Sequence, residues 1–156
     1  MNTLRISLAV FLLCLSVSGA HAQSRAELPS DFTIELLGRC IIYSISYQYT
    51  FEQQFGVEVG ASVLGGTDET IIFLSGGGRV YLTKKNAAPC IGAGFVAVTA
   101  PTSSGPFSDD NSATYFYIGP GFEYRSDGGF VVRGTVNFLI RSGFFVWPGV
   151  QLGVAF

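Results

Sequence analysis

Apolar residues alternate with small or polar residues, at a period of two, along most of the chain beyond residue 40. In the clearest run, residues 41–51, every odd position carries Ile, Tyr or Phe, while most even positions carry Ser, Gln or Thr. The same period recurs in residues 55–64, 130–140 and 150–156, and no apolar stripe with helical spacing is comparably long. Because successive side chains of a strand point to opposite faces, this pattern predicts β-strands with one apolar face.

Turn signals divide the pattern into eight segments, most of which reach the ~9–11 residues that a tilted strand needs to cross a bilayer. The connections 52–54, 84–89 and 126–128 are turns on one side, whereas 65–70 and 100–112 lie on the other side and tend to be longer. This asymmetry is typical of outer-membrane barrels, although the second-side connection 141–144 is short. The sequence therefore predicts an all-β fold, an eight-stranded antiparallel up-and-down transmembrane barrel. Its predicted strands are Phe32–Gly38, Ile41–Phe51, Phe55–Leu64, Ile71–Thr83, Cys90–Thr99, Ala113–Arg125, Gly129–Ile140 and Phe145–Phe156.

The composition of the two strand faces separates a membrane barrel from a soluble one. The non-apolar face is mostly Gly, Ser, Thr, Ala, Gln and Asn, and only 13% of the chain is charged, about half the usual share of a soluble domain. Small residues fit inside a narrow barrel, whereas a soluble barrel would turn Lys and Glu toward water. A soluble secreted or periplasmic barrel that binds an apolar ligand, like a lipocalin, is the alternative interpretation.

Aromatic residues of the apolar face gather at the strand ends beside the short turns, as they do in a girdle at a membrane interface. These residues are Tyr49, Phe51, Phe55, Phe122, Tyr124, Phe130 and Phe156. A soluble core needs no such common height, so the girdle favours a lipid bilayer as the surroundings of the barrel.

Residues 1–22 have the three parts of a secretory signal peptide: a positive start at Arg5, an apolar run over 6–17 and the cleavage site Ala20-His21-Ala22. The run is shorter than the ~20 residues of a transmembrane helix. We therefore expect a cleaved signal peptide at 1–22 and a barrel domain at 23–156 in the bacterial outer membrane. The only histidine, His21, leaves with the signal.

Three segments carry a family resemblance: Tyr-Ser-Ile-Ser-Tyr at 43–47, Gly-Gly-Phe-Val-Val-Arg at 128–133, and the ending at 147–156, which closes on Phe156. With the signal and the short strands, they resemble small bacterial outer-membrane barrels of the OmpA/OmpX architecture and, more narrowly, uncharacterised outer-membrane β-barrel proteins. The resemblance covers essentially the whole mature chain. It implies insertion by the barrel assembly machinery, with Phe156 as part of the recognition signal, and it implies no ligand or activity.

A mature chain without histidine offers no Ser-His or Cys-His pair and no His-based metal site. Lys84 and Lys85 lie in a predicted turn as solvated charges, and the acidic groups at 68–69 and 109–111 lack the spacing of a calcium loop. The net charge of −2 gives no footprint for nucleic acid. The sequence therefore predicts no catalytic, cofactor-binding or metal-binding residue. It favours a non-enzymatic protein whose external loops serve envelope integrity, adhesion or binding of an unidentified surface partner.

Two cysteines remain in the mature chain, Cys40 and Cys90. The predicted strands place them at opposite ends of the barrel, about 25 Å apart. A disulfide needs Cα atoms within about 7 Å of each other. We therefore expect two free thiols.

Five charged residues have inward parity near one depth of the predicted barrel: Glu35, Glu58, Arg79, Glu123 and Arg133. Glu58 and Arg79 fall on neighbouring strands. With a three-residue turn at 126–128, Glu123 falls opposite Val131 and has Arg133 as its diagonal neighbour. In a barrel this narrow, the five charges predict a hydrogen-bonded plug. Charged rings also line channels, so a small ion or solute path is the alternative.

Overall fold

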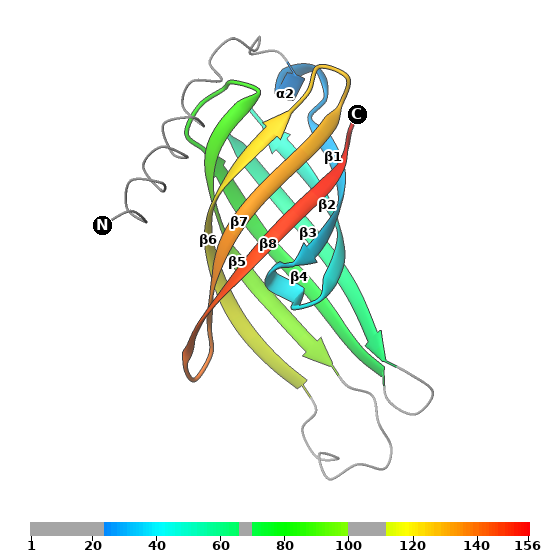
Figure 1. The fold of residues 1–156 in the computed structure, drawn as a ribbon, viewed down its shortest axis with the longest axis vertical. Coiled ribbons are helices and arrows are strands. Elements are labelled where there is room, and N and C mark those ends of the chain that lie inside the picture. The colour runs from blue at the N-terminus through cyan, green and yellow to red at the C-terminus, as the bar shows by residue number, and fades with distance from the viewer. Residues whose placement is uncertain (1–23, 66–69, 100–111) are drawn as a thin grey trace, which may run out of the picture.

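The computed structural model describes residues 24–65, 70–99 and 112–156, which form a closed barrel of eight strands. Each strand pairs antiparallel with its neighbours in sequence, and β1 pairs with β8 to close the barrel (Figure 1). The predicted eight-stranded up-and-down fold is confirmed. The strands are β1 (Ser30–Leu37), β2 (Tyr43–Phe51), β3 (Phe55–Gly65), β4 (Thr70–Tyr81), β5 (Ala87–Thr99), β6 (Ser112–Arg125), β7 (Phe130–Ile140) and β8 (Phe144–Ala155).

The two ends of the barrel differ. One end, here called the base, carries the connections 52–54, 82–86 and 126–129, the terminal Phe156 and the one-turn helix α2 (Ser24–Glu27) (Figure 1). The opposite end, here called the mouth, carries the connection between β1 and β2 and the end of the β7–β8 hairpin. The predicted signal peptide and the acidic positions 68–69 and 109–111 lie outside the described residues.

The wall is not equally tall all round, because strand length varies. β1 and β2 have 8 and 9 residues, whereas β4, β5 and β6 have 12, 13 and 14. The join between β1 and β2 is the short 3₁₀ turn η1 (Gly38–Cys40), all of whose residues are buried. The prediction that the first strand extends to Gly38 and the second begins at Ile41 is therefore wrong. Here the chain leaves the sheet and turns into the lumen.

The two faces of the wall have opposite chemistry. Outward side chains are large, apolar and exposed along every strand, for example Ile34, Val59, Phe95 and Phe116. Inward side chains in the half of the barrel near the base are polar or charged and buried, among them Thr33, Gln48 and Glu123. Among the described residues, no helix has the length and apolarity needed to span a membrane.

The hairpin between β6 and β7 corrects the predicted register. Glu123 lies directly opposite Arg133, not opposite Val131, which pairs with Arg125. The backbone N–H of Ser126 donates to the carbonyl of Phe130 at 2.8 Å, so the turn lies one residue later than the sequence suggested. Gly129 closes this turn at φ +85°, a conformation that glycine adopts without strain.

Glycines of β4 and β5 make room for a large side chain in the lumen. A Cβ atom on Gly77 or on Gly94 would collide with the hydroxyl of Tyr117, and each would also collide with the backbone of the other strand. The run 76–78 thus lies inside a strand, where close packing requires it. It lets the ring of Tyr117 reach across toward η1.

Candidate functional site

The most distinctive chemistry of the described residues is a set of nine charged side chains buried in the lumen, here called the lumen network. Burying charge is costly unless every charge is paired and hydrogen-bonded. The network contains five guanidinium groups and four carboxylates, which gives it one excess positive charge. Its members are Arg25, Asp31, Glu35, Arg39, Glu58, Arg79, Glu123, Arg125 and Arg133.

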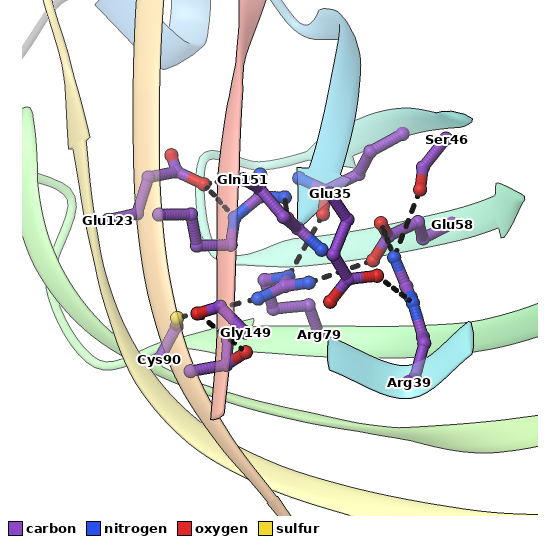
Figure 2. Close-up of polar contacts among 12 residues, drawn as sticks. Glu35, Arg39, Ser46, Glu58, Arg79, Cys90, Glu123, Gly149 and Gln151 are labelled. Carbon is purple, nitrogen blue, oxygen red and sulfur yellow. Dashed lines mark hydrogen bonds and ion pairs between the residues drawn. The ribbon is translucent and has the colours of Figure 1, made fainter. Parts of the chain in front are cut away.

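The half of the network nearer the mouth is centred on Glu58. Its two carboxylate oxygens accept from Arg39 and from Arg79, the latter at 2.8 Å (Figure 2). Arg39 donates in addition to Glu35 at 3.0 Å, to the Tyr117 hydroxyl at 3.0 Å and to Ser46 at 3.1 Å. All three nitrogens of this guanidinium are thus engaged, by side chains of β1, β2, β3 and β6.

The half nearer the base is centred on Glu123. Its oxygens accept from Arg133 at 2.7 Å, from Arg25 at 3.0 Å and from the hydroxyl of Tyr81 at 2.6 Å. The Nε of Arg125 lies 3.4 Å from the same carboxylate. A carboxylate surrounded by three guanidiniums is strongly stabilised in its charged form, and both Glu123 and Arg133 are fully buried.

Neutral side chains join the two halves into one network. The Nε of Arg79 donates to Gln48 at 3.1 Å, and the Gln48 amide donates to the Tyr81 hydroxyl at 2.7 Å. That hydroxyl in turn donates to Glu123. On the far side of the lumen, Arg133 donates to Gln151. An unbroken chain of hydrogen bonds therefore crosses the barrel from Arg39 to Arg25.

The structure brings together the pairs that strand parity had suggested. Glu58 lies beside Arg79, and Glu123 lies beside Arg133, both at ion-pair distance. Glu35, however, contacts Arg39 rather than any of the other four predicted residues. The five predicted residues are therefore parts of one larger network.

Four members of the network were not predicted, and the sequence carried a signal for two of them. Asp31 shares the inward parity of Glu35, and Arg125 shares that of Glu123, so extending the pattern to the strand ends would have found both. Arg39 comes from η1 and Arg25 from α2. Neither segment is a strand, and alternation therefore gives no information about where these side chains point.

Arg25 closes the base of the barrel. Its guanidinium donates to Glu123 and to the backbone carbonyls of Thr83 and Lys85, and it lies 4.1 Å above the ring of Tyr81. Arg125 donates to the carbonyl of Leu28 at 2.6 Å, which holds the following segment against the same opening. The chain between α2 and β1 is thus fixed to the base of the lumen.

Both cysteines of the barrel are free and buried, as predicted. Cys40 lies in η1 beside Phe73, Val96 and Tyr117, and Cys90 packs near the base. Burial raises the pKa of the Cys40 thiol to about 11. A thiol with so high a pKa is almost entirely protonated at neutral pH and is a poor nucleophile.

This arrangement fills the lumen with paired charges. The carboxylates are bound to guanidiniums, and no group of three or more His, Cys, Asp or Glu residues in the described chain is placed to hold a metal ion. Beside the half nearer the mouth lies a cavity of about 10 Å³, lined by Arg39, Arg79, Gln151 and neighbours. That volume suits about one water molecule.

Comparison with known proteins identifies the fold. No family model and no curated protein matches the chain. Among solved structures, it is similar to the N-terminal β-barrel domain of OprF from Pseudomonas aeruginosa, with 13% identity, a TM-score of 0.61, and coverage of 81% of this chain and 95% of that one. It also matches Ail, the attachment invasion locus protein of Yersinia pestis, solved with the heparin analogue sucrose octasulfate, at 13% identity and a TM-score of 0.42, over 81% of this chain and 92% of that one. The likeness to the OprF domain shows a shared barrel fold.

Proposed function

We propose that this chain is a small integral protein of the bacterial outer membrane, without enzymatic activity, whose lumen network closes the barrel. One observation carries the proposal: the protein is apolar outside and charged inside. The outer wall exposes Val, Ile, Leu and Phe side chains over all eight strands, while five of the eight Lys and Arg residues in the described chain are buried in the lumen.

Water would make this distribution costly. Each Å² of apolar surface left in water forgoes about 25 cal/mol, and outward residues such as Phe116 and Val59 remain more than half exposed. A soluble barrel that carries an apolar ligand would need the opposite arrangement, with a polar wall and an apolar lumen. Lipid removes the cost of the wall, and outer-membrane barrels have such an apolar band.

Aromatic side chains support the same placement. Tyr49, Phe51, Phe55 and Phe130 are exposed on the outer wall at the base, and Phe95, Phe116 and Phe144 are exposed toward the mouth. Two aromatic levels separated by aliphatic residues match the two interfaces of a bilayer. We infer that the base faces the periplasm and that the connections at the mouth are displayed outside the cell. There they would serve envelope integrity, adhesion or surface binding.

An arginine placed in the middle of the outer wall tests the membrane assignment. We expect Val59→Arg to destabilise the folded barrel by about 2–4 kcal/mol, because its side chain would lie near the midplane of the bilayer. Gln53→Arg, in a turn at the base, is the matched control and should cost almost nothing. Urea titration in lipid vesicles, read from the shift between folded and unfolded bands on an unboiled gel, measures both variants. An equal, small effect of the two variants, or recovery of the wild-type chain as a detergent-free soluble monomer, would contradict the assignment.

Phe156 is proposed to be part of the signal that the barrel assembly machinery recognises. Its backbone N–H donates to Ser30 at 2.9 Å, its carbonyl accepts from Ser30 at 3.2 Å, and its exposed ring stacks on Phe32. Phe156→Ala keeps the two backbone hydrogen bonds between Phe156 and Ser30, where β1 and β8 close the barrel, and removes only the ring. Deletion of Phe156 removes the ring and the two hydrogen bonds. If the ring is recognised, both variants should lower the amount of barrel in the membrane to a similar extent while the signal peptide is still removed. A defect confined to the deletion would mean that closure of the barrel between β1 and β8 alone matters.

A further inference from the structure

Between the lumen network and the mouth, the inward-facing side chains change from charged to apolar. Cys40, Phe73, Val96 and Tyr117 form a buried apolar cluster at that level. The inward side chains beyond it, toward the mouth, are also largely apolar and only partly buried: Leu64, Ile71, Val98, Tyr115 and Leu139. Side chains that point into a membrane barrel do not contact lipid. Contact with lipid therefore does not explain why the inward side chains near the mouth are apolar.

A cavity of about 170 Å³ opens in this region, between Ile41, which directly follows η1, and the mouth ends of β6, β7 and β8. We call it the mouth cavity. It is lined by Ile41, Tyr115, Leu139, Ile140, Arg141, Gly143 and Phe145. A cavity of about 150 Å³ with similar aliphatic and aromatic walls is large enough to bind benzene. The mouth cavity therefore has room for one ring or one alkyl chain end, and not for the several chains of a membrane lipid.

Apart from Arg141, the polar side chains in the cavity wall and directly beside it have partners within the protein. The hydroxyl of Tyr115 donates to the backbone carbonyl of Arg39, and the indole N–H of Trp147 donates to the carbonyl of Ile41 at 3.1 Å. Phe145 stacks on Trp147 with ring centroids 5.3 Å apart. These contacts hold the walls in place and leave carbon atoms as the surface that an occupant would meet.

One charged group borders the cavity. Arg141 is exposed at the end of β7 and makes no ion pair with any other residue that the structure describes. A guanidinium binds a carboxylate through two parallel hydrogen bonds, which no ammonium can form with it. An apolar pocket with a single arginine at its rim is complementary to an apolar tail that carries one anionic head.

We propose that the mouth cavity binds a single-chain fatty acid, with the end of its alkyl chain between Tyr115, Leu139 and Phe145 and its carboxylate on Arg141. The occupant reaches the site from the mouth, where β1 and β2 are shortest and the wall is lowest. Binding in the mouth cavity leaves the ion pairs of the lumen network, on the side toward the base, unbroken. The protein then acts as a surface binder of the fatty acid and not as a channel for it.

Trp147 provides the readout, because it is the only tryptophan in the chain and stacks on a wall residue of the cavity. The full mature protein is inserted in uncharged phosphatidylcholine vesicles and titrated with decanoate, decyltrimethylammonium or acetate. We expect a saturable change of Trp147 fluorescence with decanoate only. Arg141→Gln should weaken binding at least tenfold, and Leu139→Phe, which fills the cavity, should abolish it. Lys84→Gln, which removes an exposed cation at the base, should bind as the wild type does.

Each variant is first shown to be folded by its mobility on an unboiled gel. A non-saturable response that survives in Arg141→Gln would mean that decanoate enters only the bilayer, and it would overturn the proposal. An equal response to decyltrimethylammonium would overturn it as well. So would the absence of any saturable response in the wild-type protein, since the cavity would then be closed or filled by the chain itself.

Discussion

At the scale of single residues, the lumen network depends on how many partners each charge has. Glu123 binds three arginines and Tyr81, so it has more charged partners than the other carboxylates. Arg133 does not depend on Glu123 alone, because Gln151 and Asp31 also lie beside it. Loss of Arg133 leaves Glu123 with two guanidiniums, whereas loss of Glu123 leaves three guanidiniums facing one another. The carboxylate is therefore the more sensitive side of the pair.

We expect Glu123→Gln to destabilise the barrel by about 3–5 kcal/mol, the usual cost of removing one partner of a buried pair. Arg133→Ala should cost less. The double variant Glu123→Gln with Arg133→Gln should recover much of the loss, because five positive and four negative charges become four and three, and the excess of one is restored. Urea midpoints in vesicles measure all three.

Glu52→Gln, which removes an exposed carboxylate in a turn at the base, is the control for the change of charge alone. If Glu123→Gln were as mild as this control, water in the lumen would be screening the network. A double variant less stable than the single one would mean that Arg133 stabilises the barrel by contacts other than its pairing with Glu123.

At the scale of elements, two short segments close the lumen from opposite ends. η1 brings Arg39 down from the mouth, and α2 brings Arg25 up from the base. The backbone of Ile41 adopts φ 75°, which is unfavourable for a β-branched residue. Its carbonyl accepts from Trp147, and the carbonyl of Ile42 accepts from Leu37 at 2.7 Å. Contacts with the wall thus hold the turn in a conformation that its own sequence does not favour.

The position of Arg25 predicts its resistance to protease. Trypsin cleaves after arginine, and the buried Arg25 should be protected in the folded protein. Glu123→Gln removes its charged partner, so we expect cleavage after Arg25 to become at least several-fold faster. Mass spectrometry of the folded gel band would detect the chain that begins at Ala26. Glu27→Gln, an exposed change in the same helix, should leave the rate unchanged. Rapid cleavage of the wild-type protein at this site would show that α2 is not held by the network.

At the scale of the whole molecule, the sequence predicts the barrel well because strand geometry dictates the alternation. A residue that is out of phase would place an apolar side chain among buried charges or a polar one on the apolar outer wall, so the period persists along each strand. The charged residues of the lumen are predictable from the sequence only where they lie on strands. Glu58, Arg79, Glu123 and Arg133 follow from parity, whereas Arg25 and Arg39 belong to segments without a period. The register of β6 and β7 is fixed at their turn by the bonds between Ser126 and Phe130 and by the positive φ of Gly129, which the pattern of apolar residues does not encode.

Transport through the barrel as a whole depends on whether the lumen network leaves a path open. The lumen network spans the interior from η1 to α2, and the small cavity beside Arg39 and Arg79 has room for about one water molecule. An ion would have to separate several guanidinium–carboxylate pairs in order to pass. We therefore expect no steady, large conductance from the wild-type protein in planar bilayers. Arg25→Ala should remain closed as well, because Glu58, Arg39 and Arg79 still block the lumen above it. Steady, large conductance in the wild type would refute the plug and favour an ion path. Conductance in Arg25→Ala alone would instead place the whole barrier at the base.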